Sequence, residues 1–302
     1  MSHNQCVLLC PGQGAQKVGM GRAWVDAHPA SAQTFASADA VLDLEIEGTR
    51  HKLSEVCFDG PEELLNRTDV SQPALYTSAV ASYQGLLEQG WERQAIASAG
   101  LSLGEWTALH LAGVIGFVDG LRLVALRGRL MQDAAKASRG SMVALIGADE
   151  SQADEVCEQA ADGEVLVPAN YNAPGQIVIS GAVDACSRAI EVATSIGLRA
   201  TQLSVAGAFH SPLMGPAAEG LAEALEPVLR QSFKPAFLAV RRAAHEVGRD
   251  ADAPRRRIHG DDMSRILHEA RCRISHPCPP CPVSRRSGGY GEPGVEPGAA
   301  YA

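Results

Sequence analysis

Apolar and polar positions along the chain form short apolar runs and longer stretches with helical spacing. The runs at 7–9 and 95–99 predict two buried strands, and helical spacing of apolar residues predicts helices over 20–47, 72–89 and 119–137. Because single strands alternate with helices in this part of the chain, the pattern is typical of an α/β fold.

The pattern changes between residues 141 and 209. It predicts, in chain order, a strand over 142–146, a helix over 150–161, strands over 165–167 and 176–180, a helix over 183–196 and a strand over 200–205. The order βαββαβ is that of a ferredoxin-like split unit. We therefore expect a large α/β domain, residues 1–138 and 207–238, that is interrupted by a small ferredoxin-like subdomain over 139–206.

A G-x-S-x-G pattern occupies residues 100–104, directly after the predicted strand 95–99 and before a stretch of helical composition. A serine on so tight a strand–turn–helix needs residues without Cβ two positions before and after it. It also lies at a helix N-terminus, where free N–H groups and the positive end of the dipole stabilise a developing oxyanion. Ser102 is therefore the candidate nucleophile.

His210 is the strongest candidate for a general base among the nine histidines. It lies where the predicted subdomain returns to the large domain, before Pro212 and a helix predicted from about residue 217 to 229. The ordinary pKa of imidazole suits removal of a proton from serine near neutral pH. Taken alone, a histidine at this place more often has a surface or capping role. We expect a cleft between the two domains with Ser102 on one side and His210 on the other.

Composition narrows the classes of function. The chain is 46% hydrophobic, as in ordinary globular proteins, and no apolar segment approaches the ~20 residues that cross a bilayer. Its start has no basic region before a long apolar run, so we expect a cytoplasmic protein whose eight cysteines are free thiols. Residues 1–240 contain 15 Lys and Arg against 27 Asp and Glu, which argues against a nucleic-acid partner.

The composition changes abruptly near residue 240. Residues 241–302 contain 11 Arg, no Lys, 8 acidic residues and only seven Leu, Ile, Val or Phe. Such a segment buries little apolar surface, so we expect an atypical, poorly ordered tail over 239–302, of the kind that a reading-frame change produces. Within it, Cys278 and Cys281 have the spacing of a zinc-ligand pair, but a second such pair is missing, and we predict no metal site.

Five motifs, covering about residues 5–238 in this order, resemble the malonyl-CoA:acyl-carrier-protein transacylase family, which includes the acyltransferase domains of fatty acid and polyketide synthases. They are Pro11-Gly12-Gln13-Gly14-Ala15-Gln16, Gly100-Leu101-Ser102-Leu103-Gly104-Glu105, Arg127-Gly128-Arg129-Leu130-Met131-Gln132, Asn170-Tyr171-Asn172-Ala173-Pro174-Gly175-Gln176 and Gly207-Ala208-Phe209-His210-Ser211-Pro212-Leu213-Met214. The resemblance implies an α/β-hydrolase-like large domain with an inserted ferredoxin-like small domain.

The resemblance also implies roles for single residues. Ser102 is similar to the family's nucleophile and His210 to its general base. Arg127 is similar to the residue that binds the malonyl carboxylate, for which a planar guanidinium is suited because it meets a carboxylate bidentately and keeps its proton. The backbone N–H groups of Gln13 and Leu103 are similar to the family's oxyanion hole.

Two further residues are implied to bind the substrate. They are Asn170 and Phe209, and in the family a phenylalanine before the catalytic histidine accompanies the unbranched malonyl group. The implied reaction moves malonyl from malonyl-CoA to the phosphopantetheine thiol of acyl carrier protein through an acyl-serine, in fatty acid biosynthesis. It implies no metal and no cofactor beyond these substrates.

The chain departs from the family pattern in two places. Leu101 occupies the position where the family usually has histidine, and after about residue 238 the family's remaining core strands and a histidine-orienting glutamine are missing. Two alternatives stay open. An α/β-hydrolase esterase shares the serine turn but needs no counterpart of Arg127. A catalytically impaired relative of the transacylases would explain the atypical tail.

Overall fold

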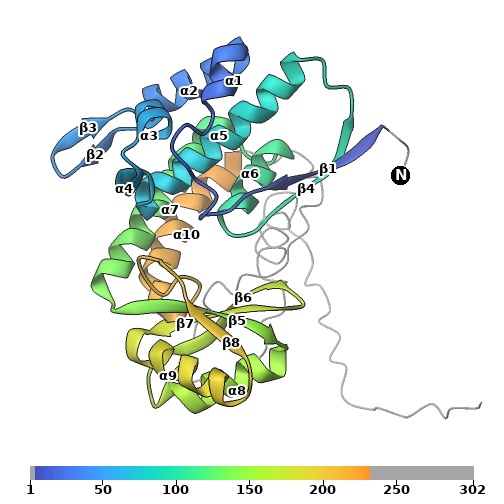
Figure 1. Ribbon diagram of the computed structural model, residues 1–302. Coiled ribbons are helices and arrows are strands. Elements are labelled where there is room, and N and C mark those ends of the chain that lie inside the picture. Colours follow the sequence, from blue (N-terminus) through green and yellow to red (C-terminus); the bar gives the residue numbers. More distant parts are fainter. Residues whose placement is uncertain (1–3, 232–302) are drawn as a thin grey trace, which may run out of the picture.

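The computed structural model describes residues 4–231, and Figure 1 shows their arrangement. The helices are α1 (Arg22–Ala27), α2 (Pro29–Val41), α3 (Leu53–Asp59), α4 (Glu62–Leu65), α5 (Thr68–Glu88), α6 (Leu103–Leu111), α7 (Phe117–Ala137), α8 (Glu150–Ala161), α9 (Val183–Ser195), the 3₁₀ turn η1 (Pro212–Met214) and α10 (Gly215–Gln231). The strands are β1 (Gln5–Cys10), β2 (Leu44–Ile46), β3 (Thr49–His51), β4 (Gln94–Gly100), β5 (Gly140–Ala148), β6 (Leu166–Ala173), β7 (Gly175–Ala182) and β8 (Arg199–Gln202). The predicted tail, 239–302, lies outside the described residues.

The larger part of the described structure, which we call the body, contains β1–β4, α1–α7, η1 and α10 (Figure 1). The long helices α5 and α7 pack side by side, and they approach closely at Gly128, where a Cβ would lie 2.8 Å from the carbonyl oxygen of Thr68. Fully buried side chains such as Tyr76 and Leu121 fill the space between them. This packing fixes the relative position of every side chain on the facing sides of the two helices.

Strands β1 and β4 form a two-stranded parallel sheet in the body. Helix α6 packs against both strands, and Ser98 of β4 donates a hydrogen bond to the carbonyl oxygen of Ala108 at 2.8 Å. The carboxyl ends of both strands therefore reach the same edge, and β4 leads directly into the turn that contains Ser102.

The second part, which we call the small subdomain, runs from β5 to β8. Its four-stranded antiparallel sheet has the order β6-β7-β5-β8, and α8 and α9 pack against it around buried residues such as Val143, Leu145 and Ile179. The element order β5-α8-β6-β7-α9-β8 is the one that the hydrophobic pattern predicts. The domain boundary positions at 139 and 206 stay predictions.

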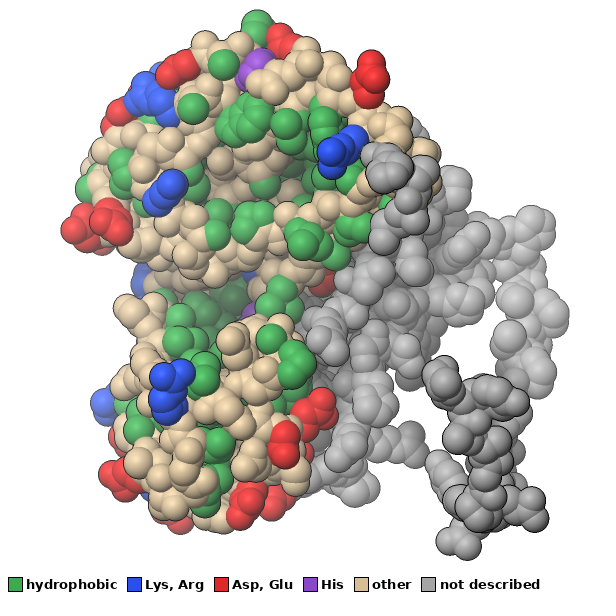
Figure 2. Space-filling view, turned by 45° about the vertical axis from the view of Figure 1, so that its right-hand side comes forward, with side chains coloured by type: hydrophobic (Ala, Val, Ile, Leu, Met, Phe, Trp, Pro, Cys, Tyr) green, Lys and Arg blue, Asp and Glu red, His purple; other side chains and the backbone are tan. Residues whose placement is uncertain are grey.

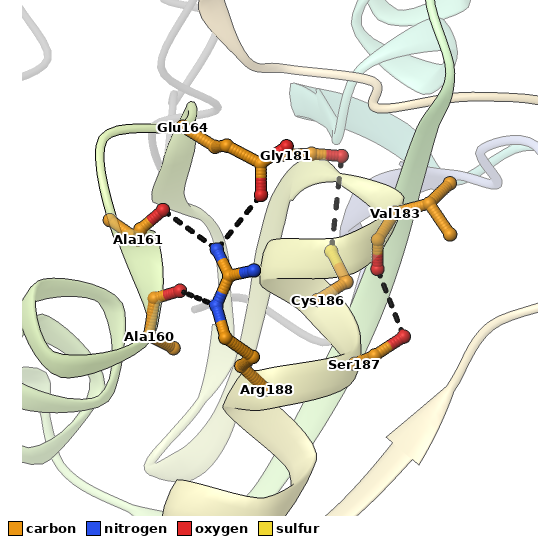
Figure 3. Close-up of polar contacts among 8 residues, drawn as sticks. All are labelled: Ala160, Ala161, Glu164, Gly181, Val183, Cys186, Ser187 and Arg188. Carbon is orange, nitrogen blue, oxygen red and sulfur yellow. Dashed lines mark hydrogen bonds and ion pairs between the residues drawn. The ribbon is translucent and has the colours of Figure 1, made fainter.

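Arg188 ties α9 to the end of α8 in the small subdomain (Figure 3). Its guanidinium donates to the carbonyl oxygens of Ala160 and Ala161, each at 2.8 Å, and to the Glu164 carboxylate at 2.8 Å. The last carbonyl groups of a helix have no partner within the helix, and here a side chain of the neighbouring helix supplies one. The role of this arginine is structural.

Three local predictions differ from the structure. Residues 20–47 form two helices and then enter a β2–β3 hairpin, instead of one helical region. Helix α5 begins at Thr68 and includes Pro73 within its second turn, although the proline suggested a start there. Asn170 lies within β6, because pairing with β7 extends both strands through most of the predicted loop. Within residues 4–231, no helix is long and apolar enough to cross a membrane.

Candidate active site

Ser102 stands on a strained turn between β4 and α6. Its backbone has φ 55° and ψ −111°, a region that residues with a side chain rarely occupy. A Cβ at Gly100 would lie 2.1 Å from the carbonyl carbon of Gly104, and a Cβ at Gly104 would lie 2.3 Å from the carbonyl oxygen of Cys10. Both glycines are therefore required for strand and helix to close around the serine, as the sequence spacing indicated.

The loop after β1 lies against this turn, since a Cβ at Gly12 would be 3.0 Å from the carbonyl oxygen of Leu101. Gln13, the next residue, is thereby held beside the serine turn. Leu103 is the first residue of α6, so its N–H has no acceptor within that helix. The role of the Gln13 and Leu103 N–H groups in an oxyanion hole stays a prediction.

Arg127 reaches Ser102 from the middle of α7. Only 3% of the arginine is exposed, its Nη2 donates to Ser102 Oγ at 3.0 Å, and its Nη1 donates to Gln72 Oε1 at 2.6 Å. The two residues lie 25 positions apart in the sequence, and the packing of α6 and α7 brings them together. A buried positive charge thus touches the candidate nucleophile directly.

Gln72 was missed by the sequence analysis. It is fully buried on α5, and its Nε2 lies 3.5 Å from Gln13 Oε1 and 3.4 Å from Met131 Sδ. Gln13 in turn donates from Nε2 to Thr68 Oγ1 at 3.4 Å. The only signal in the sequence is a polar amide at position 72 among residues that a buried helix would contain.

His210 lies on the segment that returns from the small subdomain, with φ 58°. The residues before it, Gly207 to Phe209, are buried, and Ser211 after it is fully buried with its Oγ donating to the Ala208 carbonyl oxygen at 2.7 Å. Burial, and to a smaller extent the positive charge of Arg127, lower the pKa of His210 to about 3. The imidazole is therefore neutral, and able to accept a proton, across the physiological pH range.

Among the described residues, no hydrogen bond joins the His210 ring to Ser102 Oγ; that oxygen accepts from Arg127 instead. The positive charge of Arg127 contributes to the lowered pKa of His210, so the histidine lies within electrostatic range of the guanidinium that contacts Ser102. Catalytic hydrogen bonds are often absent or long before the substrate binds. That His210 acts as the general base for Ser102 therefore stays a prediction.

The other two predicted substrate-binding residues, Phe209 and Asn170, take no part in the hydrogen bonds among Ser102, Arg127 and Gln72. Phe209 is 5% exposed and packs in an apolar cluster that includes Met131 and Met142, next to the helix that bears Arg127. Asn170 is 8% exposed and lies on β6 of the small subdomain, opposite Val178. Their contacts with substrate stay predictions. Figure 2 shows a hollow between the body and the small subdomain with hydrophobic side chains along it.

No group of three metal-ligating side chains gathers anywhere in residues 4–231. The group that these residues do form is a serine on a strained turn, a buried arginine against it and a neutral histidine nearby. Such a group of residues is suited to acyl transfer in which the serine carries the acyl group and the arginine pairs with a negative charge on the substrate.

Comparison with known proteins agrees with this chemistry. The family described as "Acyl transferase domain" matches residues 7–258. The chain belongs to this family. Malonyl CoA-acyl carrier protein transacylase of Escherichia coli (strain K12) is 41% identical over 225 residues, which are 74% of this chain and 70% of that protein. The protein of the same name from Bacillus subtilis (strain 168) is 39% identical over 225 residues, 74% of this chain and 68% of that protein.

Solved structures agree in fold. Malonyl CoA-acyl carrier protein transacylase from Clostridium perfringens superposes with a TM-score of 0.70 at 38% identity, over 77% of this chain and 70% of that one. A type II PKS acyl-carrier protein in complex with its malonyl-transacylase gives a TM-score of 0.69 at 40% identity, over 74% and 70%. The α/β acyltransferase fold expected from the sequence is thereby confirmed.

Proposed function

We propose that this chain transfers a malonyl group from malonyl-CoA to the phosphopantetheine thiol of acyl carrier protein, through a malonyl ester of Ser102. The proposal is supported by relatives at about 40% identity that are named malonyl CoA-acyl carrier protein transacylase, and by a malonyl-transacylase at 40% identity that was solved in complex with a type II PKS acyl-carrier protein. It places the chain in fatty acid biosynthesis or a related polyketide route.

The contact between Arg127 Nη2 and Ser102 Oγ, at 3.0 Å, supports the choice of acyl group most directly. In malonyl-CoA one methylene separates the carboxylate from the thioester carbonyl. A guanidinium that touches the attacking oxygen therefore lies within reach of that carboxylate when the oxygen meets the carbonyl carbon. Burying the malonyl carboxylate without a positive partner would cost free energy, and Arg127 supplies that partner. An acetyl group has no carboxylate, so pairing with Arg127 would not stabilise it.

Acylation begins when Ser102 Oγ attacks the thioester carbonyl carbon and its proton passes to His210. The negative charge on the former carbonyl oxygen would be stabilised by the N–H groups of Gln13 and Leu103. The C–S bond then breaks, and the proton on His210 leaves with the sulfur of CoA as a free thiol. The product of this half-reaction is malonyl-Ser102.

The second half-reaction is the reverse with a different thiol. The phosphopantetheine thiol of the carrier protein gives its proton to His210 and attacks the ester carbonyl, and Ser102 takes the proton back as the C–O bond breaks. The reaction as proposed uses no cofactor other than the CoA thioester and the carrier-bound phosphopantetheine. We expect the reaction to take place in the cytoplasm, with neither a membrane nor a nucleic acid as a partner.

Intact mass measured after brief incubation with malonyl-CoA tests the proposal. One malonyl group should add to the wild-type chain and none to Ser102→Ala, while Ser151→Ala, an exposed serine on α8, should label like the wild type. Release of the label by a carrier-protein thiol distinguishes transfer from the hydrolysis expected of an esterase. A folded wild-type chain that takes no label would favour the catalytically impaired relative and contradict the proposal.

A further inference from the structure

Gln72 is a fully buried amide in the body, and both ends of its side chain have partners. Its Oε1 accepts a 2.6 Å hydrogen bond from Arg127 Nη1, shorter than the 3.0 Å hydrogen bond from Arg127 Nη2 to Ser102 Oγ. A buried amide is costly unless its polar atoms are paired, so this position would favour an apolar residue if packing were its only role.

The orientation of the Gln72 amide follows from its partners. Arginine has five N–H donors and no acceptor, so the atom that faces Arg127 Nη1 must be the amide oxygen. The amide nitrogen then faces Gln13 Oε1, at 3.5 Å, and Met131 Sδ, at 3.4 Å. The Gln72 side chain thus contacts both Arg127, the proposed carboxylate-binding residue, and Gln13, whose backbone N–H is a proposed oxyanion donor.

The acceptor that Gln72 offers to Arg127 is uncharged. A neutral acceptor at Nη1 fixes the plane of the guanidinium but does not neutralise it, whereas a carboxylate at the same place would pair with it. Nη2 is directed at Ser102 Oγ in the same arrangement. A neutral amide at position 72 therefore orients the cation while keeping it attractive to an anionic substrate.

We infer that Gln72 is a positioning residue for the proposed malonyl transfer: its amide oxygen holds the Arg127 guanidinium against Ser102, while its amide nitrogen contacts the Gln13 side chain. The inference rests on the proposed function for its substrate. The geometry on which it depends, two hydrogen-bonded contacts of one buried amide, exists without any substrate.

Two variants at position 72 distinguish positioning from packing. Gln72→Leu keeps the volume but removes both hydrogen-bonding ends, and we expect kcat/KM for malonyl-CoA to fall about tenfold to a hundredfold while that for acetyl-CoA changes less than about threefold. Gln72→Glu keeps an acceptor but neutralises Arg127, so KM for malonyl-CoA should rise while Arg127 stays held. Equal losses for the two acyl groups, with lowered thermal stability, would show that the residue only fills space.

Gln132→Leu is the matched control, because Gln132 is an amide on α7 whose Oε1 accepts from the Thr68 backbone N–H at 3.2 Å. It removes a comparable hydrogen bond between α5 and α7. We expect its ratio of malonyl to acetyl transfer to equal that of the wild type. A change in that ratio as large as in Gln72→Leu would overturn a specific role for Gln72.

A second measurement needs no activity. Phenylglyoxal modifies accessible arginines, and peptide mass mapping compares Arg127 with the exposed Arg129 in the same digest. We expect Arg127 to be protected in the wild type, Gln72→Glu and Gln132→Leu, and modified several-fold faster in Gln72→Leu. If the wild type takes no malonyl label, the proposed function fails, and this measurement alone decides the inference. Protection that persists in Gln72→Leu would contradict it.

Discussion

The β1–β4 sheet of the body and the four-stranded sheet of the small subdomain differ in how far they bury their apolar side chains. In the small subdomain, Val143, Leu145 and Ile179 on the central strands are fully buried under α8 and α9. In the body, β1 leaves Val7 44% exposed and Leu9 80% exposed. Parallel sheets are normally covered on both faces, and α6 covers one face of β1 and β4.

This difference shows what holds the candidate active site together. The small subdomain is stabilised by side chains that interlock across its sheet, as in ordinary cores. The serine turn instead depends on backbone contacts, since Gly100 and Gly104 let β4, α6 and β1 approach without any side chain between them. The β1–β4 sheet, which leads into the serine turn, is also the less covered of the two sheets. A catalytically impaired relative of the transacylases would have such a sheet, and the malonyl-labelling experiment tests that alternative.

The largest effect should come from breaking a backbone contact in the body. Gly100→Ala would place a Cβ 2.1 Å from the carbonyl carbon of Gly104, and neither backbone segment can move away. We expect a loss of about 4 kcal/mol or more in the free energy of unfolding, together with loss of malonyl labelling. Denaturant titration measures the first, and intact mass the second.

The matched control is Gly116→Ala, because a Cβ there would meet only the Asp119 carboxylate, at 3.8 Å. Its stability should lie within about 0.5 kcal/mol of the wild type. If Gly100→Ala proved as mild as this control, the serine turn would not depend on close backbone contact, and the contrast between the two sheets would fail.

A smaller effect should come from side chains in the two sheets. Leu145→Ala removes a fully buried side chain from β5 and should cost about 2–5 kcal/mol. Leu9→Ala removes an 80% exposed side chain from β1 and should change stability by less than about 0.5 kcal/mol. Thermal and denaturant unfolding of the two variants measure the difference. A cost for Leu9→Ala near that for Leu145→Ala would mean that the outer face of the body sheet is covered after all.

Local patterns predicted most of the fold. The G-x-S-x-G spacing predicted the serine turn because its geometry depends on five consecutive residues. The β2–β3 hairpin was missed because its two-residue turn has Glu47 at φ 53° before Gly48 at φ 77°, and glutamate is a weak signal for a left-handed position. Asn170 was assigned to a loop by its neighbouring Pro and Gly, whereas pairing with β7 decided its conformation.

The candidate site could be predicted only where residue type itself indicated chemistry. Ser102, Arg127 and His210 have side chains whose reactivity or charge suggests a role. Gln72 has neither, and its importance depends on the approach of α5 and α7, which brings it to an arginine 55 positions away. Long-range contacts of this kind leave no local pattern in the sequence.

The smallest of these effects concerns protonation of His210, which lies where the segment from the small subdomain meets the body. Because burial and the positive charge of Arg127 together lower its pKa to about 3, acylation of Ser102 should show no loss of rate near pH 6.5, the ordinary value for histidine. Replacing Arg127 with Gln should raise the pKa, since a positive charge is removed, but only in part, since burial is the larger cause. Rates of acetyl-CoA labelling against pH measure both.

The same shift has a consequence for stability. The unfolded chain binds a proton at His210 below about pH 6.5, and the folded chain does not until about pH 3, so folding loses stability as the pH falls through that interval. His210→Gln should reduce this loss, and His51→Gln, on the β2–β3 hairpin, should leave it unchanged. An acid limb near pH 6.5 in the wild-type rate, or equal acid stability of all three chains, would show that His210 is solvated. The returning segment would then not be closed against the body as the structure has it.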